Sequence, residues 1–250
     1  MFWEHWRLPT DRLNPNPKGK VAFNSASDYV KRFNEKKSIM KRLVLFILII
    51  LIGSIGYYYG FYTPSVYNGI DISHHNKVNW LSIKKQNLEF CYIKATEGKS
   101  FRDNKCIEHS YNAKNIGLNV GLYHYFRTDV SAKEQFSNFM KMYNQAYSNL
   151  IPAIDVEEHG NNYNSEGAVN KLLELISLFK EEFNTAPVIY IGNFSCAKYI
   201  PLMLECPLWL RAVTFKNIIP NTTIKQTAII DNIDRNYCKN INELILKNNQ

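Results

Sequence analysis

The sequence predicts an α/β fold: a TIM-like barrel that begins with β/α units and finishes with plain strands, preceded by one transmembrane helix. From residue 68 onward, short apolar runs alternate with amphipathic stretches of helical length. This alternation is typical of parallel strands joined by right-handed helical crossovers. After residue 213 the alternation stops and short strands with turns follow. An uncharged apolar run over residues 43–62 predicts the membrane span.

The net charge of +8 belongs mostly to the N-terminal segment. Residues 1–42 contain ten Lys and Arg against four Asp and Glu, so they contribute +6 and the other 208 residues contribute +2. A nucleic-acid-binding domain would carry the basic excess on its folded surface, so we expect no nucleic-acid partner. Residues 1–42 are instead typical of a basic cytoplasmic tail beside a membrane span.

Residues 43–62 read LVLFILIILIGSIGYYYGFY and hold no charge. A helix of that length is about 30 Å long, which matches the hydrocarbon layer of a bilayer. Basic residues precede the run and none follows until Lys77, so the positive-inside bias places the tail in the cytoplasm. We expect a signal anchor in the inner membrane over 43–62, a linker over 63–67, and a barrel over 68–250 in the periplasm or another extracytoplasmic space.

Two alternatives to a retained anchor stay open at this point. The first is a cleaved signal peptide, but a leader of 42 residues is long for one, and the triplet Ser54-Ile-Gly56 lies inside the apolar run rather than after it. The second is a buried core helix, which rarely lacks a polar face over twenty residues.

Six strands and four helices are expected in the barrel. The strands are predicted over residues 69–73, 90–95, 120–126, 151–157, 188–192 and 208–213, and the helices near 80–87, 104–116, 131–148 and 165–184. Ser131 and Glu134 form a capping box at the start of the third helix, and Gly117 is a natural residue to follow the second. Polar and aromatic side chains collect where the strands end, which is where β/α barrels build their active sites.

Asp155 and Glu157 are the sharpest pair at these strand ends. Side chains at positions i and i+2 of a strand point to the same face, with Cα atoms about 6.5–7 Å apart. Carboxylates that close raise one another's pKa, so one of them can stay protonated near neutral pH. A proton donor beside an ionised carboxylate is what cleavage of a glycosidic bond requires. The alternative is a solvated acidic turn that ends the strand.

The other candidates at the rim each have a structural alternative. Asp71 either joins the acids or caps the end of its own strand. Tyr123, Tyr125 and Tyr190 either stack on sugar rings or close the top of the barrel. Lys94 and Glu97 either form an ion pair that shapes the site or are ordinary charges on the rim.

Histidines and cysteines give no support for a metal site. His74, His75, His124 and His159 lack the HxxxH or HxH spacing of metal ligands, so we expect hydrogen-bonding roles for them. The five cysteines all follow residue 62 and show no CxxC spacing. We therefore expect no metal and no cofactor.

Several motifs follow one another through the barrel region. They are GIDISHHNKVNW (69–80), YIKATEG (92–98), Asp103, VGLYHYF (120–126), IDVE (154–157), VIYIGNF (188–194), PLWLRA (207–212) and IDRN (233–236). Together they resemble glycoside hydrolase family 25, the Chalaropsis-type lysozymes, and span nearly all of residues 68–240 in the family's order. The sequence departs from the family at Lys225-Gln226, where a Trp-Gln pair is common, and at 231–234, where DNID replaces the usual glycines.

The resemblance implies a flattened (β/α)5(β)3 barrel that hydrolyses the β-1,4 bond between N-acetylmuramic acid and N-acetylglucosamine in peptidoglycan, without metal or cofactor. Glu157 would be the general acid and base, and Asp155 would steer the substrate's acetamido group, which attacks the anomeric carbon. The expected site has Glu157, Asp155, Asp71 and Asp234 as catalytic residues and Tyr123, Tyr190, Lys94, Glu97, His124 and Tyr125 as substrate-binding residues.

The leading hypothesis is thus a muramidase that acts on peptidoglycan strands as a monomer from a membrane tether. A catalytically inactive peptidoglycan-binding module is the main alternative, and the intact pair of Asp155 and Glu157 argues against it. A metal-dependent amidase or deacetylase would need histidine ligands, which the spacing does not supply.

Overall fold

The computed structural model describes residues 37–41, 43–44, 46–47, 67–211 and 222–247. The chain divides into two compact units, Met1–Thr63 and Pro64–Gln250. The described residues of the first unit are helical. The tail, the anchor over 43–62 and the linker over 63–67 lie mostly outside the described residues. Within the ranges that are described, no helix combines the length and the apolar character needed to cross a membrane.

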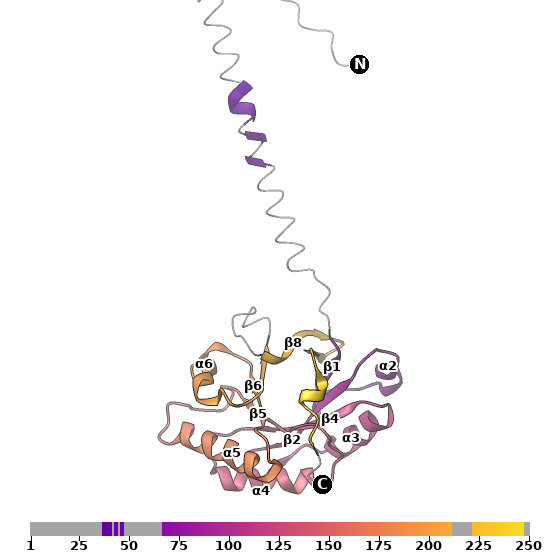
Figure 1. Cartoon of the computed structure of the whole chain (residues 1–250), viewed down its shortest axis with the longest axis vertical. Coiled ribbons are helices and arrows are strands. Elements are labelled where there is room, and N and C mark those ends of the chain that lie inside the picture. Colours follow the sequence, from indigo (N-terminus) through magenta and orange to yellow (C-terminus); the bar gives the residue numbers. More distant parts are fainter. Residues whose placement is uncertain (1–36, 42, 45, 48–66, 212–221, 248–250) are drawn as a thin grey trace, which may run out of the picture. The chain divides into compact units, whose positions relative to one another are not determined.

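In the described residues of the second unit, eight strands form a closed sheet (Figure 1). The strands are β1 (Gly69–Ile72), β2 (Phe90–Glu97), β4 (Asn119–Tyr125), β5 (Ala153–Val156), β6 (Val188–Ile191), β7 (Leu208–Arg211), β8 (Thr222–Ile230) and β9 (Ile233–Cys238), with the two-residue β3 (Phe101–Arg102) paired to the end of β2. Strand β1 pairs in parallel with β2 and antiparallel with β9, which closes the ring. Neighbouring strands from β1 to β8 run parallel, apart from the short β3.

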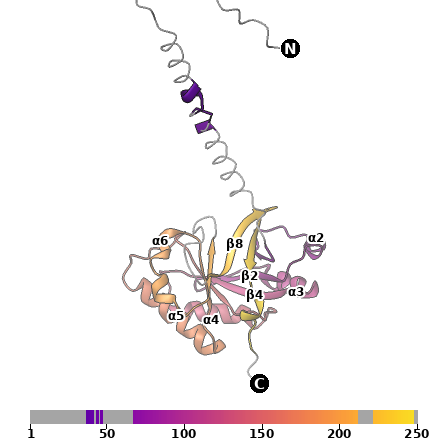
Figure 2. The same cartoon turned by 45° about the horizontal axis from the view of Figure 1, so that its top comes forward.

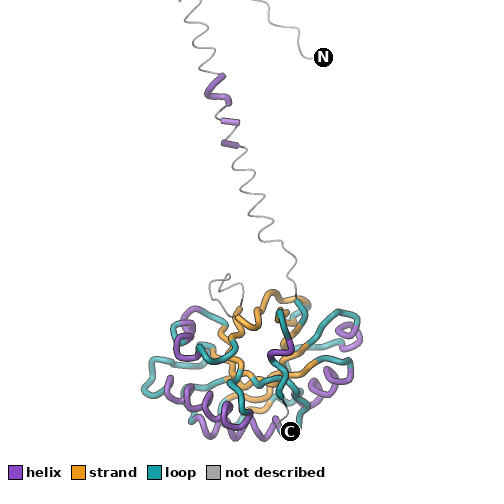
Figure 3. The backbone as a smooth tube through the Cα atoms, in the orientation of Figure 1, coloured by secondary structure: helices purple, strands orange, loops and turns teal. Residues whose placement is uncertain are grey.

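Helices surround the ring of strands on the outside, as Figures 2 and 3 show. They are α2 (Trp80–Lys84), α3 (Cys106–Asn115), α4 (Ala132–Tyr143), α5 (Ala168–Phe183) and α6 (Phe194–Ala197), followed by the 3-10 turns η1 (Ile200–Met203) and η2 (Ile241–Glu243). Each of the first five barrel strands is followed by an α-helix, whereas within the described residues no α-helix follows β7, β8 or β9; residues 212–221, between β7 and β8, lie outside them. The prediction of an α/β barrel that ends in plain strands is confirmed.

The expected helix ends are found where the sequence signals were strong. The Ser131 hydroxyl accepts a hydrogen bond from the Glu134 amide at 3.3 Å, which begins α4. Gly117 follows α3 with φ of +91°, the left-handed conformation that suits glycine. Helix α4 ends at Tyr143 rather than near 148, and α2 ends at Lys84 rather than near 87.

Strand alternation divides the apolar side chains into two cores. In β2, Phe90 and Tyr92 point into the barrel, and Cys91 and Ile93 point towards the helices. The inner core includes Val188, Trp209, Ile224 and Leu244 among its buried residues. A Cβ atom at Gly121 would overlap the ring of Tyr92, so a glycine is needed for this ring to fit inside the barrel.

The turn between β8 and β9 explains one departure from the family's sequence. Asp231 and Asn232 have φ of +53° and +59°, as both central residues of a two-residue hairpin turn of type I′ do. Asp and Asn tolerate this conformation better than other side chains with a Cβ. The turn therefore forms without the glycines, and β9 still begins in register with Asp234 opposite Ile229 of β8 and Asp71 of β1.

Candidate active site

A cavity of about 180 Å³ lies inside the ring of strands. It is lined by Asp71, Tyr123, Asp155, Glu157, Tyr190, Trp209, Gln226 and Asp234. Apart from Asp234, these residues come from six strands or their C-terminal ends; Asp234 is the second residue of the antiparallel β9. The cavity thus brings together all four acids expected to be catalytic, and two of the tyrosines expected to contact substrate.

Asp155 and Glu157 share one face of the same strand end. Asp155 lies in β5 and Glu157 directly follows the last residue of that strand, and Val156 between them is buried in the outer core. The Oδ1 atom of Asp155 is buried and has no hydrogen-bond partner among the described residues. An unsatisfied buried oxygen costs free energy, so a cavity-lining carboxylate in this state is ready to accept a hydrogen bond from a ligand.

Glu157 is packed against the backbone of the next strand end. A Cβ atom at Gly192 would overlap Oε1 of Glu157 and lie 3.3 Å from the Tyr190 hydroxyl. Any other residue at position 192 would therefore displace the carboxylate. Gly192 directly follows β6, and the Glu157 carboxylate occupies the space that a side chain at position 192 would need.

Burial raises the pKa of both members of the pair. For Asp155, desolvation is the main cause and the charge of Glu157 adds to it, while Lys94 acts in the opposite direction. For Glu157, desolvation also raises the pKa, against the positive charges of Arg211, His159 and Lys94. The pair therefore retains a proton at pH values where an exposed carboxyl group would have lost it.

Asp71 is held by a chain of side-chain hydrogen bonds on the opposite wall. Its Oδ2 accepts from Asn236 at 2.7 Å and from Gln226 at 3.4 Å. Trp209 donates to Asn236 at 2.8 Å, and Tyr190 donates to Gln226 at 2.9 Å. Desolvation and the nearby charge of Asp234 raise the pKa of Asp71 to about 7, against these two amide hydrogen bonds.

Three of these partners were not among the predicted site residues. Trp209 and Gln226 line the cavity, and Asn236 joins Trp209 to Asp71. Asn236 stands two positions after Asp234 on β9. Trp209 packs against Tyr190 with ring centroids 4.9 Å apart. Strands β7 and β8 held no predicted site residue from which alternation could be extended, so Trp209 and Gln226 are identified only by the closed barrel.

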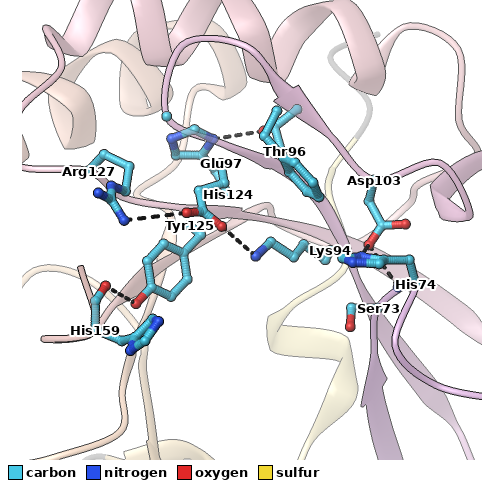
Figure 4. Close-up of polar contacts among 12 residues, drawn as sticks. Ser73, His74, Lys94, Thr96, Glu97, Asp103, His124, Tyr125, Arg127 and His159 are labelled. Atoms are coloured by element: carbon cyan, nitrogen blue, oxygen red, sulfur yellow. Dashed lines mark hydrogen bonds and ion pairs between the residues drawn. The ribbon is translucent and has the colours of Figure 1, made fainter. Parts of the chain in front are cut away.

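Lys94 and Glu97 form the expected ion pair, but beside the cavity rather than in its lining (Figure 4). The Lys94 ammonium lies 2.8 Å from Oε2 of Glu97, and the Arg127 guanidinium lies 3.5 Å from Oε1. Lys94 also lies 4.8 Å from the ring centroid of Tyr125, whose hydroxyl donates to the carbonyl of His159 at 2.8 Å. These contacts hold the side chains of Lys94, Glu97 and Tyr125 in place beside the cavity.

His124 does not reach the cavity, which corrects the expectation that it binds substrate. It alternates with Tyr123 along β4 and therefore points towards the helices. Its ring has no exposed surface and is hydrogen-bonded to Thr96 at 2.7 Å and Gln135 at 3.0 Å, and desolvation lowers its pKa to about 4. A side chain without exposed surface cannot contact a sugar. Within the described residues, no three His, Cys, Asp or Glu side chains are grouped as metal ligands.

A pair of carboxyl groups in the mouth of a β/α barrel suits the hydrolysis of a glycosidic bond. The family model for "Glycosyl hydrolases family 25" matches residues 70–229, more than half of the chain. The chain belongs to glycosyl hydrolase family 25.

Curated relatives are similar in sequence to shorter stretches of the chain. The chain is 42% identical to "Lysozyme M1" of Streptomyces globisporus over 65 residues, which cover 26% of this chain and 22% of the relative. It is 28% identical to "Uncharacterized protein YegX" of Escherichia coli K12 over 150 residues, which cover 57% of this chain and 55% of the relative. The chain thus spans about half or less of the length of these relatives.

Solved structures support the same assignment. A family 25 glycosyl hydrolase from Bacillus anthracis is 27% identical, with a TM-score of 0.58 over 70% of this chain and 89% of that one. The spore cortex lytic enzyme SleM of Clostridium perfringens is 24% identical, with a TM-score of 0.60 over 73% of this chain and 70% of that one, and shares the fold.

Proposed function

We propose that this protein is a muramidase that cleaves the β-1,4 bond between N-acetylmuramic acid and N-acetylglucosamine in peptidoglycan. The observation that carries the proposal is the carboxyl pair at the end of β5, with Glu157 and Asp155 lining one cavity. Membership of glycosyl hydrolase family 25 supports the choice of substrate.

Glu157 is the proton donor in this proposal. Desolvation raises the pKa of Glu157, so its carboxyl group holds a proton to higher pH than an exposed glutamate does, which suits a general acid. The proton passes to the glycosidic oxygen as the bond from the anomeric carbon to that oxygen breaks. The carbonyl oxygen of the substrate's acetamido group forms the new bond to the anomeric carbon, so the configuration is inverted once.

Asp155 positions that acetamido group. Its unpaired Oδ1 accepts the amide N–H, which orients the amide carbonyl towards the anomeric carbon. Glu157, now ionised, takes a proton from water, and the water oxygen displaces the acetamido oxygen. The second inversion restores the original configuration, and Glu157 is protonated again for the next cycle.

Product analysis tests this proposal. The full chain is incubated with purified peptidoglycan, and the new reducing ends are identified by mass spectrometry. Muramic acid at the reducing ends is the expected result. Glucosamine at the reducing ends, or freed peptides, would show a different bond specificity and overturn it.

The matched variants are neighbours in sequence. Glu157→Gln keeps the shape of the side chain but cannot donate a proton as a carboxyl group does, so digestion should fall by about 10³-fold. Glu158→Gln alters an exposed carboxylate one position away and should digest at the wild-type rate. Equal activity of the two variants would exclude Glu157 as the acid.

The membrane tether over residues 43–62 is part of the proposal. It is supported by the uncharged run and the basic residues before it. In its described part, Leu43, Val44, Phe46 and Ile47 are helical, and each has about half or more of its surface exposed, which leaves apolar area for lipid. Full-length protein should remain in membranes washed with carbonate; its release into the wash would contradict the tether.

A further inference from the structure

A cluster of three rings lies beside the cavity and has no part in the mechanism above. It consists of His74 and His75, which follow β1, and Phe101 in β3; we call it the ring cluster. The His74 ring centroid lies 5.5 Å from that of Phe101 and 3.8 Å from that of His75. Phe101 is 41% exposed, so its ring offers an apolar surface to solvent.

His74 is fixed by a buried carboxylate. Oδ2 of Asp103 accepts from the His74 backbone amide at 2.8 Å and contacts Nδ1 of its ring at 2.8 Å (Figure 4). The Asp103 side chain has no exposed surface, and its other oxygen accepts from the Lys105 amide at 2.9 Å. Since a carboxylate partner requires a proton on Nδ1, Nε2 is the ring atom left to meet a ligand, on a side chain that is 28% exposed.

The ring cluster adjoins the catalytic cavity. His74 stands three residues after Asp71, which lines the cavity, so the two Cα atoms are separated by at most about 10 Å of extended backbone. Lys94 links the two places: its ammonium lies 5.4 Å from the centroid of Phe101, and its charge lowers the pKa of Asp155 and Glu157. A glycan strand bound in the cavity can therefore continue over the ring cluster.

We propose that the ring cluster is an outlying glycan subsite, where a sugar ring of the bound strand stacks on Phe101 and hydrogen-bonds to Nε2 of His74. This inference rests on the proposed function, because the strand is the one that Glu157 cuts. An exposed aromatic face beside one fixed polar atom combines apolar contact with orientation, as ligand sites do. The neighbouring cations Lys94 and Arg127 are already paired with Glu97, which favours an uncharged sugar over the carboxylates of a stem peptide.

Binding measurements on an uncleaved complex test the subsite. The full chain carrying Glu157→Gln, purified in detergent, is titrated with peptide-free oligosaccharides of one, two and three disaccharide repeats. Adding Phe101→Ala should weaken binding of the longest oligosaccharide about 5–10-fold and change binding of the disaccharide by less than about twofold. Tyr111→Ala removes an aromatic ring of similar exposure from α3 and should change neither.

The His74→Asn variant distinguishes loss of a sugar contact from loss of folding stability. The Asn amide can still donate to Asp103 but lacks an atom in the place of Nε2, so the melting temperature should hold while binding of the longest oligosaccharide weakens about 3–5-fold. Equal affinity of the Phe101→Ala and Tyr111→Ala chains for every length would overturn the subsite. Loss of affinity only when a stem peptide is attached would overturn the sugar as its ligand. If the Glu157→Gln chain binds no glycan of any length, the proposed function fails as well.

Discussion

Among the described residues, charged side chains are paired on the rim beside the cavity and unpaired inside the cavity. On the rim, Lys94 and Arg127 both contact Glu97. The cavity lining includes four acids, which are Asp71, Asp155, Glu157 and Asp234. In the part of the chain that the structure describes, none of the four forms an ion pair within 4 Å.

This difference separates stability from function. Paired charges on a partly exposed rim stabilise modestly and shape the surface. Carboxyl groups that are desolvated without cation partners have raised pKa values, and folding is disfavoured when they ionise. Such an arrangement is expected where a protein uses the groups for chemistry. Mutations that neutralise charge should therefore act differently in the two places.

After Glu157→Gln, Asp155→Asn should have the largest effect in the cavity. The variant keeps an oxygen and the size of the side chain, but loses the charge and places an NH2 group near the unpaired Oδ1 position. Turnover of peptidoglycan should fall by about 10²–10³-fold, measured as reducing ends released per minute. The matched rim variant Glu97→Gln should lose less than about tenfold; an equal loss would remove the distinction between cavity and rim.

Gly192→Ala should disturb the cavity through shape alone. The added methyl group overlaps Oε1 of Glu157, so the carboxylate must move from its present position. A misplacement of about 1 Å in a catalytic group can lower kcat about 10²-fold, and we expect a loss of about 10–100-fold with little change in KM. The control is Gly167→Ala: a methyl group there meets no atom within 4 Å, and any strain from its φ of +72° acts away from the cavity.

Strand alternation explains how much of this site was predictable. It correctly placed Asp155, Glu157 and Tyr190 on one surface, because one face of each barrel strand must point inward. The same rule would have excluded His124, which directly follows the inward-facing Tyr123. Asn236 needed knowledge of which strands are neighbours, because its role depends on Trp209 and Asp71, which are distant in sequence.

Other features depend on geometry that no sequence pattern contains. The match between Gly192 and Glu157 arises from two strand ends that meet only in the closed barrel. The bulge in β2 between Lys94 and Thr96 likewise turns Thr96 outward to His124. The anchor over 43–62 stays a prediction, since it rests on hydropathy and charge alone.

Asp71→Asn should raise stability at alkaline pH. Because folding raises the pKa of Asp71 from 3.8 to about 7, its favourable contribution is complete below pH 3.8 and is lost as the pH rises through about 7. Asn stays neutral and can still accept the amide hydrogen bonds. The melting temperature at pH 8 should rise by about 5 °C, with no difference near pH 4.

Two results sharpen the comparison. Glu97→Gln removes a paired rim charge and should leave the melting temperature at pH 8 unchanged or slightly lower. The Asp71→Asn chain should also lose activity, because Asp71 lines the cavity. A melting temperature for Asp71→Asn that follows the wild type at both pH values would mean that Asp71 ionises in the folded state at no cost.

Arg211→Met should have the smallest effect, a displacement of the pH profile. The positive charge of Arg211 lowers the pKa of Glu157 and of Asp234. Without it, Glu157 keeps its proton to higher pH, so the alkaline limb of kcat/KM should move upward by about half a pH unit. Lys114→Met, in the last turn of α3, removes a cation that has no such influence on Glu157 and should leave the limb in place. A downward displacement in Arg211→Met would show that Glu157 is not the group whose deprotonation ends activity.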